Sequence, residues 1–287
     1  MNLLLVIYIV SAVLVLAALV IARKQIARGL LHGIPSVYRI AGMTFAETRR
    51  RRILQVIILL AALMLVGMLG ITWLNPGESA KALVSGGLDL VFLLGILVSI
   101  FICAFLIPSD IDKRTIYSVL SKPVHRWEFV VGKYFGALAV VGLLVGIMLL
   151  VQMIVLVATQ KHPIGLVFQA GLVAYFGIAV FTAAVMVVST IASSLTTVIA
   201  GFTLWLVGSI QAMSHSVIAH IEGGFSKTVL GVVSAIIPHL DKYDFRVEAA
   251  EQLAIPLVLV QRGLVYGIGY VAVCLIIASL LFRERQV

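Results

Sequence analysis

Long uninterrupted runs of apolar residues divide the sequence, and they constrain the fold more than any other feature. A helix that crosses the hydrocarbon core of a bilayer needs about 20 such residues. Runs of this size occur at residues 3–22, 53–74, 88–107, 134–157, 165–192, 196–213 and 263–282. Of the 287 residues, 62% are hydrophobic and 11% are charged, which excludes an ordinary soluble domain and a disordered chain. We therefore predict an all-α polytopic membrane protein.

Lys and Arg collect on one side when these runs alternate across a membrane with the N-terminus outside. Of the 21 basic residues, 15 share that side: Arg23, Lys24, Arg28, Arg39, Arg49, Arg50, Arg51, Arg52, Lys113, Arg114, Lys122, Arg126, Lys133, Arg283 and Arg285. Basic loops mark the cytoplasmic side, so we expect a cytoplasmic C-terminus. Because this bias explains the net charge of +9, we expect no nucleic-acid partner.

The first apolar run lacks the pattern of a cleaved signal peptide. No Lys or Arg precedes residue 3, and the cluster of Arg23, Lys24 and Arg28 follows the run. This order is typical of an anchor whose N-terminus is outside. We expect residues 1–34 to form a retained N-terminal transmembrane helix and a basic cytoplasmic linker.

Residues 35–50 are too polar to cross the membrane but carry a helical pattern. Pro35 can start a helix. Its apolar stripe consists of Val37, Ile40, Ala41, Thr44 and Phe45. Arg39 and Glu47 fall away from the stripe, so we predict an amphipathic interfacial helix, with the Arg49 to Arg52 run at the headgroups. Contact with a partner and simple anchoring both remain open for it.

A second polar segment, residues 109–122, also reads as a short helix at the membrane face. Pro108 closes the preceding run, and Ser109 with Asp112 gives a helix start signal. Ile116, Val119 and Leu120 then form an apolar stripe before Pro123. Such a stripe is costly in the cytoplasm unless something covers it, although a solvated turn remains the alternative.

The stretch from Pro108 to Tyr134 resembles the coupling-helix region of ABC transporter permeases of the type 2 (ABC-2) family. It shares an acidic residue, the Arg114-Thr115 step, Ser-x-Pro-Val at 121–124, Arg126-x-Glu128 and the Gly132-Lys133 pair. Residues 35–50 resemble the elbow helix of that family, and residues 237–244 resemble the external segment before its last span. The resemblance implies a six-helix permease domain over residues 35–287, to which the N-terminal span is an addition.

Members of that family form the membrane half of exporters, in which two permeases pair and each sits on a cytoplasmic ATPase. The resemblance implies that residues 109–122 are a coupling helix. The expected ATPase-coupling residues are Asp110, Asp112, Lys113, Arg114, Thr115, Ile116, Val119, Leu120, Arg126 and Glu128. Those of the elbow helix are Val37, Ile40, Ala41, Phe45 and Glu47. The implied location is a prokaryotic inner membrane. A homodimer, a heterodimer and an accessory protein at the N-terminal helix all remain open.

The sequence contains no phosphate-binding loop of its own. No Gly-x-x-x-x-Gly-Lys-Ser/Thr motif occurs, and neither His-Glu-x-x-His nor Gly-x-Ser-x-Gly is present. We therefore predict a permease that is not an enzyme and has no cofactor, with ATP and Mg²⁺ in the partner ATPase. A secondary carrier or an intramembrane enzyme is the alternative, and the substrate is not identified.

Several residues within or beside the apolar runs invite functional interpretations. Polar residues inside spans tend to face protein or water, and those predicted for a translocation path are Gln152, Thr182, Ser189 and Gln211. No deep charge is expected. Three Gly-x-x-x-Gly pairs begin at Gly132, Gly142 and Gly263 and predict close helix packing or a dimer seam.

Residues 215–256 are expected outside the membrane, yet they are unusually apolar. The run 229–237 is too short to cross a bilayer, so we predict a re-entrant or interfacial segment that gates the exit. Its His and Asp spacings match no standard metal site, and Cys103 and Cys274 are expected to be buried thiols.

Overall fold

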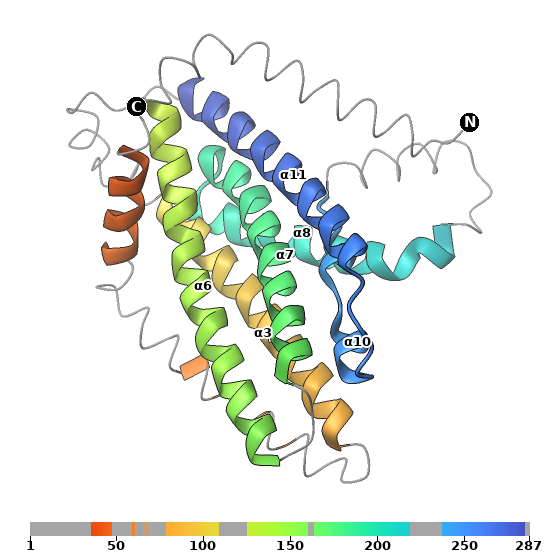
Figure 1. Ribbon diagram of the computed structural model, residues 1–287. Helices are drawn as coiled ribbons and strands as arrows, with labels where there is room; N and C mark the ends of the chain where they lie inside the picture. Colours follow the sequence, from red (N-terminus) through yellow and green to blue (C-terminus); the bar gives the residue numbers. More distant parts are fainter. Residues whose placement is uncertain are drawn as a thin grey trace.

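A computed structural model of the chain describes residues 36–47, 59–60, 63, 67, 70, 79–108, 125–159, 164–218 and 237–284. Every regular element in these residues is a helix (Figure 1). The predicted N-terminal span, most of the second span, the coupling segment 109–122 and residues 219–236 lie outside the described residues. The helical character of the described part agrees with the all-α prediction.

Four long helices form the central bundle, namely α3 (Ser79–Leu106), α6 (Arg126–Thr159), α7 (Ile164–Ile191) and α11 (Leu257–Glu284). Each is long and apolar enough to cross a membrane by length and composition. They correspond to the predicted spans 88–107, 134–157, 165–192 and 263–282. The number of spans in the whole chain stays a prediction.

Helix α7 occupies the middle of this bundle and contacts α3, α6 and α11. It is apolar around most of its circumference, as expected for a helix without a solvent-facing side. Close packing depends on small residues. A Cβ atom placed on Gly95 of α3 would lie 2.5 Å from Cδ1 of Ile178 in α7, so a larger residue there would require the Ile178 side chain to move.

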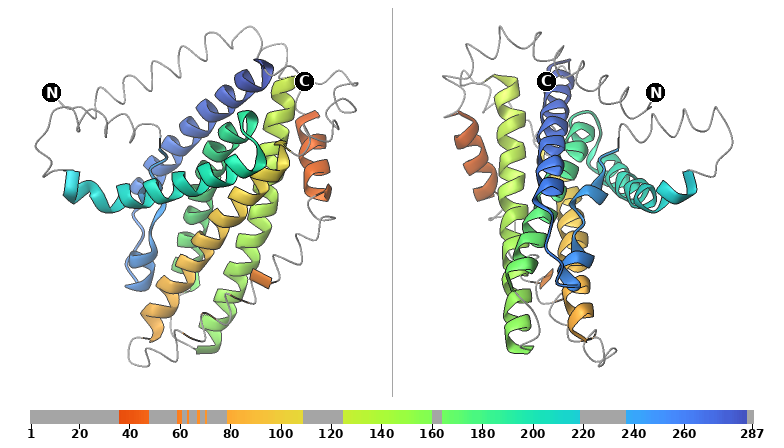
Figure 2. Two further views of the ribbon diagram at one scale, coloured as in Figure 1. Left: turned by 180° about the vertical axis from the view of Figure 1, so that it is seen from behind. Right: turned by 45° about the vertical axis from the view of Figure 1, so that its right-hand side comes forward.

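Helix α8 (Ser194–Ile218) covers the predicted span 196–213 but runs across the bundle, in contact with α3 and α7 (Figure 2). A break at residues 192–193 separates it from α7, and the Ser193 hydroxyl accepts a hydrogen bond from the Thr196 amide at 3.4 Å. The side-chain oxygen thereby satisfies one donor of the new helix. The prediction that α8 crosses the membrane stays a prediction. The hydropathy of a segment does not tell how its helix is oriented relative to the bundle.

Different helix ends lie at the two ends of the bundle (Figure 1). The start of α6 and the ends of α3 and α11 lie at one end, beside the helix of residues 36–47. The starts of α3 and α7 and the end of α6 lie at the other. Residues 237–256 reach toward this second end. We refer to these as the predicted cytoplasmic and external ends.

Candidate functional site

The helix of residues 36–47 rests on two glycines of α6. A Cβ on Gly132 would lie 2.7 Å from Cβ of Ile40, and one on Gly136 would lie 2.6 Å from Cβ of Thr44. Ile40 and Thr44 are four residues apart, as are the two glycines that they face, so the two helices run side by side in the same direction. The first Gly-x-x-x-Gly pair therefore serves packing within the chain.

The buried face of this helix is the predicted stripe. Ile40 and Thr44 are buried, and Val37, Ala41 and Phe45 are partly buried. Tyr38 and Met43 on the other face are 81% and 62% exposed. The helix lies along the first turns of α6 instead of crossing them, which differs from the direction of a helix lying flat in the membrane surface (Figure 1). The helix takes this direction because Gly132 and Gly136, which have no side chains, let Ile40 and Thr44 pack closely along α6.

An ion pair and an aromatic stack join α6 to the helix of residues 36–47 and to α11. Lys133 of α6 pairs with Glu47 at 3.8 Å, and its ammonium group lies 5.6 Å from the centre of the Phe129 ring. Phe129 in turn stacks on Phe282 of α11, with 5.5 Å between ring centres. The Gly132-Lys133 pair thus has a structural explanation, because the glycine admits the elbow helix and the lysine binds its last turn.

Only Arg126 and Glu128 among the predicted coupling residues are described. Both belong to the first turn of α6, directly after the coupling segment. Glu128 is 2% exposed, and its Oε2 atom has no hydrogen-bond partner in the described part of the chain. The helix N-terminus favours this carboxylate through its aligned N–H groups. Asp110, Asp112, Lys113, Arg114, Thr115, Ile116, Val119 and Leu120 lie outside the described residues, and their role stays a prediction.

The described polar residues of the predicted translocation path are buried within the bundle. Gln152 donates from Nε2 to the Val84 carbonyl at 3.1 Å, and its Oε1 has no hydrogen-bond partner among the described residues. Thr182 donates to the Ile178 carbonyl at 2.7 Å and contacts the Ser99 hydroxyl at 3.1 Å.

The hydroxyl of Ser189 donates to the Met186 carbonyl at 2.8 Å. Gln211 belongs to α8, but its side chain is not described. Gln152, Thr182 and Ser189 are each fully buried. Their role in a path therefore stays a prediction that requires the helices of the bundle to separate.

The external segment is anchored to the bundle by a tyrosine. It contains η1 (Leu240–Tyr243) and the short helix α10 (Arg246–Ala250). Tyr243 is 2% exposed and donates its hydroxyl proton to the Gly263 carbonyl of α11 at 2.7 Å. Its Cβ would lie 2.8 Å from a Cβ added to Gly177 of α7. Burial raises the pKa of Tyr243, which keeps the hydroxyl protonated as a donor.

Of the other two Gly-x-x-x-Gly pairs, both glycines of the last and only the first glycine of the middle one have packing partners in the described structure. The pair at Gly263 and Gly267 borders Tyr243, and Gly142 lies against the Tyr175 hydroxyl, which donates to the Leu138 carbonyl at 3.0 Å. In the described structure a Cβ on Gly146 would meet no atom within 4 Å. A dimer seam through these motifs stays a prediction.

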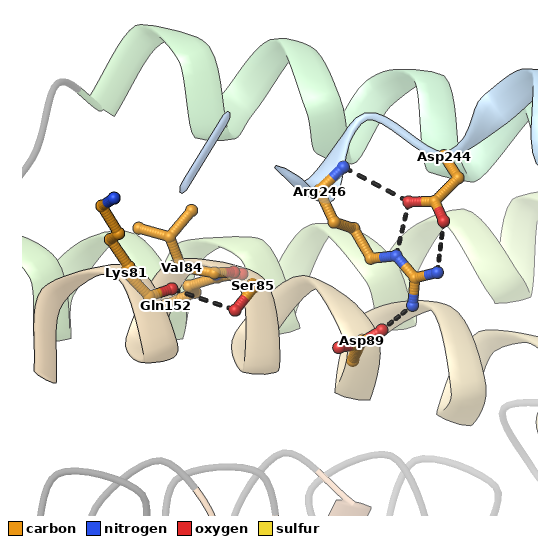
Figure 3. A network of polar contacts seen from close by, with 7 residues as sticks. All are labelled: Lys81, Val84, Ser85, Asp89, Gln152, Asp244 and Arg246. Carbon is orange, nitrogen blue, oxygen red and sulfur yellow. Dashed lines mark hydrogen bonds and ion pairs between the residues drawn. The ribbon is translucent and has the colours of Figure 1, made fainter. Parts of the chain in front are cut away.

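An ion cluster holds the external segment against α3 (Figure 3). Arg246 pairs with both Asp244 and Asp89, and its backbone amide donates to Asp244 Oδ1 at 3.3 Å. Lys242 lies over the Tyr266 ring at 3.9 Å. Burial lowers the pKa of Lys242, while the neighbouring Asp241 opposes that shift.

Sequence reasoning missed Asp89 and Tyr243 as structural contacts. The predicted span 88–107 begins one residue before Asp89. Helix α3 instead begins at Ser79, so Asp89 lies ten residues into it. The expectation that no charge lies deep in the membrane stays a prediction. A charged residue flanked by apolar residues on both sides was the available signal.

Four helices long and apolar enough to cross a membrane, with the helix of residues 36–47 and residues 237–256 packed against them, are typical of a polytopic helical membrane protein. Its sequence matches the family described as ABC-2 family transporter protein over residues 2–287. The chain belongs to this family, and it is therefore a membrane component of a transporter. Among curated proteins, none matches the chain.

Proposed function

We propose that this chain is the permease subunit of an ATP-driven exporter, paired with a second permease and docked on a separate cytoplasmic ATPase. The observation that carries the proposal is membership of the ABC-2 family over residues 2–287, in a sequence that has no phosphate-binding loop. Such a chain must obtain its driving force from a partner. Pairing, coupling to ATP and the export direction belong to the proposal.

The arrangement around the start of α6 supports a route for that coupling. The predicted coupling segment ends where α6 begins, and the first turns of α6 contact both the helix of residues 36–47 and the end of α11. A displacement of the coupling segment would therefore reach three helices at once. ATP shifts the transporter between packings only if its binding favours one of them.

The coupling helix is tested by placing a charge in its apolar stripe. We expect Ile116→Asp to abolish recovery of the ATPase with the tagged permease from native membranes, because the aspartate would have to lose its water on docking. Ser118→Asp is the matched control, since it adds the same charge to the opposite side of the predicted helix. ATPase recovery is measured by pull-down and mass spectrometry.

Equal ATPase recovery in the natural chain, Ile116→Asp and Ser118→Asp would contradict docking through the stripe. Transport by the purified chain alone in liposomes under an ion gradient would instead favour a secondary carrier. Substrate turnover in detergent without any partner would favour an intramembrane enzyme.

A further inference from the structure

Polar side chains on α3 form an exposed stripe that leads from the external end into the bundle. Lys81, Ser85 and Asp89 recur every four residues and therefore share one face of the helix. Lys81 is exposed, Ser85 is partly exposed, and the Asp89 side chain is 52% exposed. Arg246 and Asp244 of the external segment meet the inner end of this stripe (Figure 3).

The depth of the stripe follows from the packing of α3 on α6. Val145 lies midway along the apolar run 134–157, and its Cγ2 would be 3.6 Å from a Cβ on Gly95. Gly95 therefore lies near the middle of the bilayer. Asp89 precedes Gly95 by six residues (95 − 89), or about 9 Å of helix, whereas half of the hydrocarbon core is about 15 Å.

A half-exposed carboxylate at that depth is poorly compatible with contact to lipid. Ionisable residues within a membrane face protein or a water-filled cavity, because hydrocarbon cannot solvate them. The cluster consists of two carboxylates and one guanidinium, each of them partly exposed. Burial against a second copy of this chain would take these charged groups out of water, so the cluster favours an aqueous surrounding.

We infer that the Lys81, Ser85 and Asp89 face of α3 and the Asp244 and Arg246 side of the external segment line a water-filled vestibule that opens to the outside. The vestibule forms the outer end of the solute path and in that respect rests on the proposed function. Gln152, Thr182 and Ser189 lie inside the closed bundle, whereas these charged residues are already accessible. The ion cluster suits a solute that carries polar or charged groups at this point.

The vestibule is tested by spin labels attached to single cysteines in the full-length chain reconstituted in lipid. Ser85→Cys and Asp89→Cys report on the stripe. Leu93→Cys, one turn further along α3 and 40% exposed, reports on its apolar continuation. Ile154→Cys on α6 is 67% exposed and lies nine residues from Val145 (154 − 145), or about 14 Å, a depth similar to that of Ser85.

The labels are read by collision with a water-soluble nickel chelate and with oxygen, which concentrates in hydrocarbon. Labels at positions 85 and 89 are expected to collide with the nickel chelate at least about tenfold more than labels at 93 and 154, as expected for a water-filled cleft. Cys103 and Cys274 are 0% and 7% exposed, and the unsubstituted chain gives their background labelling.

Oxygen-dominated collisions at positions 85 and 89 would place the stripe in lipid and overturn the vestibule. Weak collisions with both reagents would place it in a protein interface and also overturn the vestibule. ATPase recovery with the Ser85→Cys chain is measured in parallel. Loss of the vestibule with intact recovery would leave the proposed permease function standing, so the two failures are distinguishable.

Discussion

At the scale of single residues, glycines decide where other segments can dock. Gly267 and Gly269 are two residues apart on α11, yet their surroundings differ. A Cβ on Gly267 would lie 3.0 Å from Cγ2 of Val180 and closer still to the Tyr243 hydroxyl. A Cβ on Gly269 would meet nothing within 4 Å in the described structure.

Gly267→Ala is therefore expected to lower the free energy of unfolding by about 1–3 kcal/mol, the usual cost of overpacking. Gly269→Ala adds the same methyl group in open space and should be neutral or slightly stabilising, since alanine is the better helix former. Thermal unfolding in detergent, followed by tryptophan fluorescence, compares the two variants. A similar loss of stability in both would contradict the Tyr243 anchor.

At the scale of secondary-structure elements, α6 provides the surface on which the helix of residues 36–47 packs. Its first turns contain Gly132 and Gly136, which allow the close approach, together with Lys133. The glycine motif is visible in the sequence. Its partner is not, because Ile40 and Thr44 are more than ninety residues away and come from an element that hydropathy does not identify as a span.

Gly136→Ala is expected to displace the helix of residues 36–47, since the new methyl group would lie 2.6 Å from Thr44 Cβ and 3.1 Å from the Ala41 carbonyl oxygen. Hydrogen exchange of the backbone amides in residues 36–47 should become at least several-fold faster. Gly146→Ala, further along α6 with open space around it, should leave that exchange unchanged. Equal exchange rates for residues 36–47 in the natural chain and both variants would contradict the packing of this helix on Gly136.

The sequence predicted the elements better than their contacts. The stripe from Val37 to Phe45 is the buried face of its helix, as helical periodicity indicated. The direction of α8 and the early start of α3 were not predictable, because a hydropathy window averages over neighbours and carries no orientation. The anchoring by Tyr243 depends on glycines in two other helices, which only the fold brings together.

At the scale of the whole molecule, the predicted sidedness assigns one end of the bundle to the cytoplasm and the other to the outside. The helix of residues 36–47 and the start of α6 lie at one end, and the end of α6 and the start of α7 lie at the other (Figure 1). The external segment extends toward this second end. By the predicted sidedness, the end that holds the start of α6 faces the cytoplasm.

A green fluorescent protein fused to the C-terminus should therefore fluoresce in a bacterial host, because it remains in the cytoplasm. Alkaline phosphatase inserted between His162 and Pro163 should be active, because it requires the oxidising exterior. An inverted pair of results, with an inactive phosphatase and a dark C-terminal fusion, would reverse the orientation.

The length of α6 has a mechanical consequence. Its 34 residues extend about 51 Å, against a hydrocarbon thickness of about 30 Å. An unbroken rod of that length tilts as a lever when one tip is pushed. If a partner pushes the chain near Arg126, as proposed, the opposite end of α6, where Gln152 donates a hydrogen bond to Val84 of α3, would move with it.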